Sequence, residues 1–206
     1  MIDKDLRYRE EITYLLCQSD KVSEISSISD LINLEELYLQ GHKMSSLDSL
    51  GYYPKLKKIS VAGAKTLTTT RGIMNAPNLK EFYANKAGLT DLAGLDQLKS
   101  LTHIQAMMTD ISDISALAPL DKLEQVVLNY NPISDISALA NKPNLTELQV
   151  YSSHVTDITP LFSNAALMIG GITSEEGYPC AQILHLKSLL NPDARFHVPD
   201  QCKAAE

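Results

Sequence analysis

The chain has 206 residues, of which 44% are hydrophobic and 21% charged, and its 18 Lys and Arg against 25 Asp and Glu give a formal net charge of -7. This acidic balance argues against a nucleic-acid partner, because contacts to phosphates require clustered positive charge. No apolar run reaches the roughly 20 residues of a transmembrane helix, and the first residues, MIDKDLRYREEI, are too charged for the apolar part of a secretory signal. We therefore expect a cytosolic protein or the mature form of an exported one, with no transmembrane segment.

The amino-terminal segment precedes a repeated pattern that starts at Ile12. Leu6, Ile12 and Leu15 have the spacing of an amphipathic helix, whereas Ile12, Leu15 and Cys17 also fit the repeat. We expect residues 1–11 to form an amino-terminal cap, with a short helix that ends near residue 10 and the first strand after it.

From residue 12 to residue 172 the sequence repeats an apolar pattern every 22 residues. The step is 22 throughout, except for one of 23 between Leu56 and Leu79. Such regularity is the signature of a solenoid, in which each repeat forms one coil and stacks on its neighbours. The first apolar position of the repeats holds Ile12, Leu34, Leu56, Leu79, Leu101, Leu123, Leu145 and Leu167.

Each of the roughly seven predicted coils contains one short strand. Its next two apolar positions are separated by a single residue, as in Val126 and Leu128. Residues two apart lie on the same side of a strand, so one side of each strand faces the core and the other faces outward.

A turn position follows each strand, and beyond it apolar residues recur at every third place, as in Ile133, Ile136 and Leu139. This step suits a 3-10 or extended return segment. In the clearest repeat the turn position is Asn131, whose amide can satisfy backbone groups inside the bend. Residues 62–74 carry the extra residue and break the three-residue rule, so we expect a bulge or a mobile loop there.

A column of acidic residues repeats at the start of four return segments. A stack of carboxylates could collect calcium, but calcium needs several oxygens that converge on one point. Asp before a helical turn more often accepts hydrogen bonds from exposed N–H groups. We therefore expect capping rather than metal binding. The four residues are Asp91, Asp113, Asp135 and Asp157.

The stretch ISDISALAPLDKLEQVVLNYNPISDISALANKPNLTELQVYSSHVTDITPL, from Ile111 to Leu161, resembles leucine-rich repeat proteins, specifically the 22-residue class typified by bacterial internalins. The match extends over about residues 12–170. The resemblance implies an α/β leucine-rich repeat solenoid: a curved right-handed superhelix with a parallel β-sheet on the concave face, 3-10 or irregular segments on the convex side, and a cap at each end.

The carboxy-terminal segment, residues 173–206, is expected to be a helical cap. Ile183, Leu186, Leu189 and Leu190 lie on one face of a helix that starts after Pro179.

Cys180 and Cys202 both belong to this carboxy-terminal segment, and extracellular members of the superfamily often close their ends with disulfides. The resemblance therefore implies a Cys180–Cys202 bond that staples the tail over the terminal helix. The alternative is two unconnected thiols, as in a cytosolic protein.

The sequence contains no nucleotide-binding, serine-hydrolase or zinc-protease motif. We expect no enzymatic activity, no cofactor and no metal. A hydrolase in which Cys180 is the nucleophile and His185 the base is a remote alternative, since no third group is placed to orient the histidine.

The outward positions on the strands are the candidate binding residues, because neighbouring parallel strands lie about 4.8 Å apart and present them as one patch. Tyrosine, Met and Val supply apolar contact, while Gln, Asn and Glu supply a polar surround. The alternative is a solvated face, since strands carry tyrosine well. The candidates are Glu36, Tyr38, Gln40, Glu81, Tyr83, Asn85, His103, Gln105, Met107, Val127, Asn129, Gln149 and Tyr151.

These observations favour a non-enzymatic, monomeric module that binds a protein partner on its concave face. We expect a bacterial protein that is secreted, periplasmic or on the cell surface. The alternative is a cytosolic regulatory subunit, similar to the leucine-rich repeat partners of protein phosphatases, in which all three cysteines stay reduced.

Overall fold

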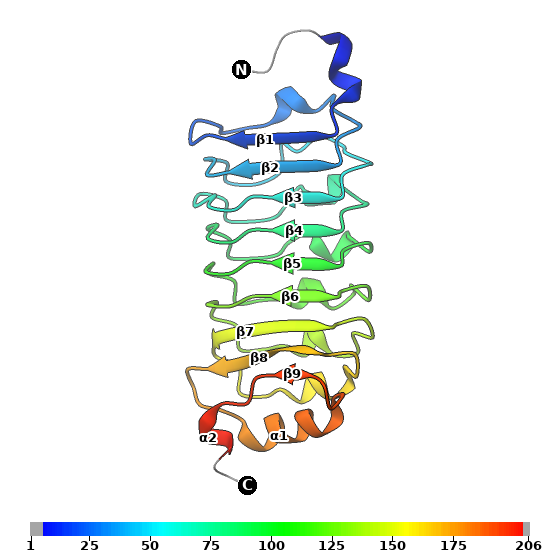
Figure 1. Ribbon diagram of the computed structural model, residues 1–206. Coiled ribbons are helices and arrows are strands. Elements are labelled where there is room, and N and C mark those ends of the chain that lie inside the picture. Colours follow the sequence, from blue (N-terminus) through cyan, green and yellow to red (C-terminus); the bar gives the residue numbers. More distant parts are fainter. Residues whose placement is uncertain (1–5, 204–206) are drawn as a thin grey trace.

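The computed structural model describes residues 6–203, and over this range nine strands form one parallel sheet in chain order. Each strand lies beside the strand of the preceding coil, and in Figure 1 the strands follow one another from β1 at the top to β9 near the bottom. The strands are β1 (Tyr14–Gln18), β2 (Glu36–Gln40), β3 (Lys58–Ser60), β4 (Glu81–Tyr83), β5 (His103–Gln105), β6 (Gln125–Val127), β7 (Glu147–Ser153), β8 (Ile169–Ser174) and β9 (Arg195–Phe196).

The return segments lie on the side of the coils opposite the sheet, and most contain one short 3-10 helix. The three-residue step of the sequence therefore predicts them well. Asp113 and Asp135 each accept a hydrogen bond from the N–H two residues ahead, at 2.7 Å, which is the capping role expected of that column. The helices are η1 (Leu6–Glu11), η2 (Ser26–Ile28), η3 (Ile73–Asn75), η4 (Leu95–Gln97), η5 (Ser115–Leu117), η6 (Ser137–Leu139) and η7 (Thr159–Ser163).

The core is one continuous column of aliphatic side chains between the sheet and the return segments. Leu37, Ile59 and Phe82 are paired in register from β2 to β4, and each is fully buried. Each such side chain contributes about 2 kcal/mol relative to exposure. The repeat thus stabilises each coil mainly through contacts with its two neighbours.

A residue with positive φ occupies the same place in six successive coils, in the bends after β2 to β6 and near the end of β7. Only two of the six are glycines, so the sequence gives little sign of this column. The residues and their φ values are Gly41 (67°), Gly63 (73°), Lys86 (59°), Met108 (55°), Tyr130 (60°) and Ser152 (53°).

Residues 62–74 do not break the three-residue rule as expected, and the strands on either side of them carry no bulge. The register of β3 and β4 stays regular, with Lys58 opposite Glu81. The extra residue is absorbed between Ala64 and Leu67, after which a three-residue step resumes. Leu67, Thr70 and Ile73 are buried at that step, and Thr70 Oγ1 donates to the Ala93 carbonyl at 2.8 Å. The sequence does not reveal this three-residue step, because Thr70 occupies a position that is apolar in the other coils.

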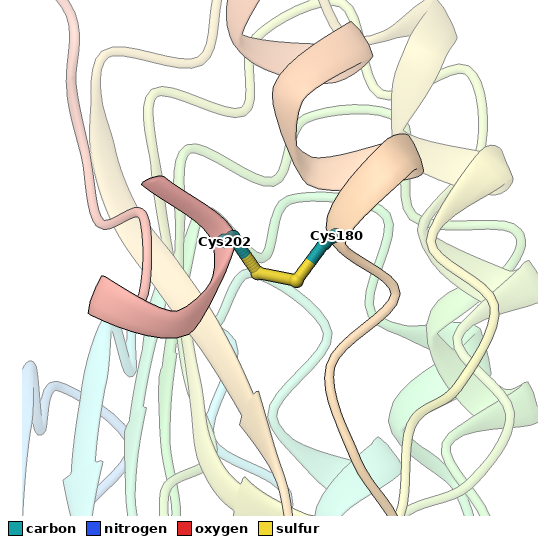
Figure 2. The surroundings of a disulfide bond; sticks show 2 residues. All are labelled: Cys180 and Cys202. Atoms are coloured by element: carbon teal, nitrogen blue, oxygen red, sulfur yellow. A yellow bond between two sulfur atoms is a disulfide. The ribbon is translucent and has the colours of Figure 1, made fainter. Parts of the chain in front are cut away.

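The carboxy-terminal segment contains α1 (Cys180–Leu189), β9 and α2 (Asp200–Lys203), which lie at the lower end of the solenoid in Figure 1. A disulfide joins Cys180 at the start of α1 to Cys202 in α2 (Figure 2), with Cys202 fully buried. On α1, Ile183 and Leu186 are buried as expected, whereas Leu189 is 46% exposed. Strand β9 was not predicted, because two residues carry no periodic signal.

At the amino terminus, η1 precedes β1, and residues 1–5 of the expected cap lie outside the described residues. Within residues 6–203 no helix has the length and apolar character required to span a membrane.

Candidate protein-binding face

The predicted outward residues of β2–β7 share one face of the sheet, which we call the concave face. Strand register aligns them in columns that run across the coils. One column contains Glu36, Lys58, Glu81, His103, Gln125 and Glu147; the next contains Tyr38, Ser60, Tyr83, Gln105, Val127 and Gln149. The remaining candidates, Gln40, Asn85, Met107, Asn129 and Tyr151, follow two residues further along their coils.

Tyr38, Lys58 and Tyr83 form an aromatic and cationic cluster on β2–β4. The Lys58 ammonium lies 4.9 Å from the Tyr83 ring centre and 6.0 Å from that of Tyr38. Lys58 Nζ also lies 3.0 Å from Glu81 Oε2, and the Tyr83 hydroxyl donates to the same oxygen at 2.9 Å. A cation between two rings gains about 0.5–1 kcal/mol at an exposed site, so these side chains hold one another in place.

Electrostatics keep this cluster in one protonation state at neutral pH. The hydrogen bond to Glu81 raises the pKa of Lys58, while burial and then the hydrogen bond to Glu81 raise the pKa of Tyr83. The lysine therefore stays charged and the phenol neutral. The sequence places Lys58 at an outward strand position, but Lys58 is not among the candidate binding residues. Its contacts with Tyr38 and Tyr83, 20 and 25 residues away, depend on the strand register.

Asn85 and Asn129 join neighbouring coils just beyond the strands. Asn85 Oδ1 accepts from the Met107 N–H at 2.9 Å, and Asn129 Oδ1 accepts from the Tyr151 N–H at the same distance. The amide of Asn129 also donates to Gln149 Oε1 at 3.1 Å. Each asparagine thus links its coil to the next coil beyond the ends of the strands. Asn85 also orients Gln105, and Asn129 orients Gln149.

Val127 and Asn129 do not supply the exposed contact expected of them. Val127 is 2% exposed and Asn129 7% exposed. The register places Val127 between Gln105 and Gln149, and both of these side chains are longer. The other candidates are half-buried and reach the surface.

Tyr151 marks the carboxy-terminal end of the concave face. Its ring meets the His197 ring edge-on, with centres 6.1 Å apart, and burial raises the pKa of its hydroxyl. The tail of the chain therefore contributes to the surface beside the last strands, which the sequence pattern does not indicate.

The structure gives no support to the remote hydrolase alternative. Cys180 is bonded to Cys202 and has no free thiol, and the His185 ring packs edge-on against Phe162 at 4.8 Å. Among residues 6–203 there is no group of three or more His, Cys, Asp or Glu side chains placed to hold a metal ion.

No protein-family model matches the chain, and no curated protein sequence matches it. Solved structures do. Internalin C2 of Listeria monocytogenes has a TM-score of 0.60 and 25% identity, covering 80% of this chain and 82% of its own. A second internalin of that species, inlF, has a TM-score of 0.58 and 26% identity, covering 81% of this chain and 57% of its own.

A leucine-rich repeat protein of Leptospira interrogans is also similar in fold, with a TM-score of 0.69 and 19% identity over 92% of this chain. This chain covers 55% of that protein and, as stated, 57% of the second internalin. It therefore spans little more than half the length of these two neighbours.

Proposed function

We propose that this chain, a leucine-rich repeat protein of the 22-residue, internalin-like class, binds a protein partner on its concave face and acts as a monomer. The fold is that of a protein-interaction module, and its repeats present an extended surface. Within the described residues, the concave face combines tyrosines, a cation, carboxylates and amides, a composition suited to recognition.

The Tyr38–Lys58–Tyr83 cluster is the observation that carries the proposal. These side chains lie on the solvent side of the sheet, so the core does not require them. Their mutual contacts fix their rotamers before a partner arrives, which lowers the entropy lost on binding. Tyrosines that are rigid and only half-buried are typical hot-spot residues.

The test is to replace one concave-face tyrosine and one tyrosine elsewhere. We expect Tyr83→Ala to weaken capture of a partner from bacterial or host extracts about tenfold or more. Tyr52→Ala is the matched control, since Tyr52 is 63% exposed on a return segment, and it should leave capture unchanged. Equal capture by Tyr83→Ala and the wild type would reject the concave face as the binding surface.

We further propose that the protein acts outside the cytosol, on a bacterial cell surface or after secretion. The Cys180–Cys202 disulfide supports this, because such bonds persist in oxidising compartments. Thiol titration of the protein isolated from its native source, under denaturing and non-reducing conditions, should find one free thiol, that of Cys17. Three free thiols would favour the cytosolic regulatory subunit instead.

A further inference from the structure

A hollow of about 470 Å³ lies at the carboxy-terminal end of the concave face. Gly170 of β8 lines the hollow, and Gly171 follows it in the strand. A Cβ on Gly170 would lie 1.7 Å from the Leu148 carbonyl oxygen, and a Cβ on Gly171 would lie 2.7 Å from His197 Cβ. A side chain at Gly170 would therefore collide with the backbone of β7, and one at Gly171 would collide with the side chains of His197 and Tyr151.

Basic side chains from three elements meet around this hollow. Lys187 comes from α1, Arg195 from β9 and Lys203 from α2. Lys203 is paired with Asp200 at 2.7 Å, whereas Lys187 and Arg195 make no ion pair within the part of the chain that the structure describes. Among the described residues, Lys187 and Arg195 thus form a positive patch in a chain whose net charge is -7.

Apolar side chains line another part of the hollow, alongside the polar Gln149 and His197. Phe196 and Val198 lie beneath it at 4% and 7% exposure, and Ile169 is 49% exposed at its side. Tyr151, which belongs to the concave face, also lines it. An apolar base with a cationic rim matches side chains that have an aliphatic stem and an anionic end, such as glutamate.

We propose that this hollow binds an acidic segment of the protein partner, with carboxylates at Lys187 and Arg195 and aliphatic stems on Phe196 and Ile169. The inference rests on the proposed function, because Tyr151 and Gln149 line both the hollow and the concave face. A peptide is favoured over a single free anion, because the charged groups here are exposed and a single exposed ion pair contributes little to binding. Several carboxylates on one chain add their contributions.

The disulfide contributes to this site by fixing its rim. Cys180 begins the helix that carries Lys187, and Cys202 is adjacent to Lys203. Their Cα atoms lie 5.0 Å apart, so α2 cannot move away from α1 while the bond is intact. Reduction should therefore weaken peptide binding as well as loosen the tail.

The experiment is an NMR titration of the full, ¹⁵N-labelled chain with an acetylated tetraglutamate peptide. We expect saturable shifts of the Tyr151, Gly171, Arg195 and His197 amides, with a tetraglutamine peptide producing none. Inorganic phosphate is the second arm and should not saturate the same amides at equal concentration. Saturation by phosphate with the same affinity would overturn the peptide assignment.

Charge variants complete the test. The double variant Lys187→Gln/Arg195→Gln should raise the dissociation constant of tetraglutamate about tenfold or more. The control is Lys65→Gln/Lys122→Gln, which removes the same charge from exposed sites elsewhere. It should change the dissociation constant less than about twofold. Equal losses in the two variants, or shifts spread over the whole surface, would reject the hollow as a site. The concave-face proposal would survive that result, because it is tested at Tyr83, outside the hollow.

Discussion

His42 occupies the same turn position in its repeat that Asn131 occupies in a later repeat. Its side chain is buried, with 2% exposure. Its Nδ1 accepts from the Met44 N–H at 3.2 Å, while its Nε2 has no hydrogen-bond partner among the described residues. Burial lowers the pKa of His42 from 6.5 to about 4. The imidazole therefore stays neutral in the folded protein under conditions in which the unfolded chain takes up a proton.

The free energy of unfolding should consequently fall as the pH is lowered, because His42 takes up a proton more readily in the unfolded chain than in the folded one. The contribution of the neutral His42 to stability is fully present above pH 6.5, which is the pKa of histidine in the unfolded chain. It is lost as the pH falls towards about 4, which is the pKa of His42 in the folded protein. Between pH 7.5 and pH 4.5 the free energy of unfolding should drop by about 2–3 kcal/mol from this group. Urea denaturation of the wild type and His42→Asn at both pH values measures it. Parallel losses in the two proteins would contradict the assignment, because Asn does not titrate.

Asn131 shows why the consensus residue suits this turn. Its amide donates to the Ala106 and Leu128 carbonyls at 2.7 and 3.0 Å, and its Oδ1 accepts from the Thr109 hydroxyl at 2.5 Å. We expect Asn131→Ala to lower the free energy of unfolding by about 3 kcal/mol, because it leaves buried carbonyls unpaired. Asn144→Ala is the control: its single hydrogen bond, to the Asp121 carbonyl, is exposed, so denaturation should detect a loss below about 1 kcal/mol. Similar losses in both would count against a buried network.

At the scale of single elements, β8 depends on the absence of a side chain. Gly170 has φ 143° and no room for a Cβ, whereas Gly177 has φ 114° with nothing within 4 Å. Gly170→Ala should therefore lower the free energy of unfolding by about 3 kcal/mol or more, because the new Cβ would both clash and strain the backbone. Gly177→Ala should lower it by about 1 kcal/mol, through backbone strain alone. Thermal denaturation of the two variants separates the effects. Equal shifts in melting temperature would mean that β8 moves to accept the new atom.

The sequence predicts the strands and return segments where the apolar spacing is regular. The prediction fails where a polar residue takes an apolar position. Thr70 hid the regular return of residues 62–74, because its hydroxyl is satisfied by the Ala93 carbonyl and so can be buried. Strand β9 pairs with β8 through two residues only, and nothing in a two-residue segment distinguishes a strand from a loop.

For the whole molecule, the 22-residue step predicts the leucine-rich repeat fold and the alignment of outward residues, because parallel strands in one register repeat their side-chain directions. It does not predict which outward residues are covered. Val127 is buried although it stands at an outward position, and Lys58 becomes part of a cluster only through tyrosines of two other coils. The basic hollow depends on how the tail folds back, which no repeat encodes.

Hydroxyl-radical footprinting of the chain, alone and bound to its captured partner, tests the concave-face claim most directly. Tyr38, Tyr83 and Met107 carry oxidisable side chains on that face, while Tyr52 and Met74 are 63% and 47% exposed on return segments. Binding on the concave face predicts a several-fold fall in oxidation of the first three residues and no change in the last two. Protection of Tyr52 and Met74, with Tyr38 and Tyr83 still fully oxidised, would contradict it.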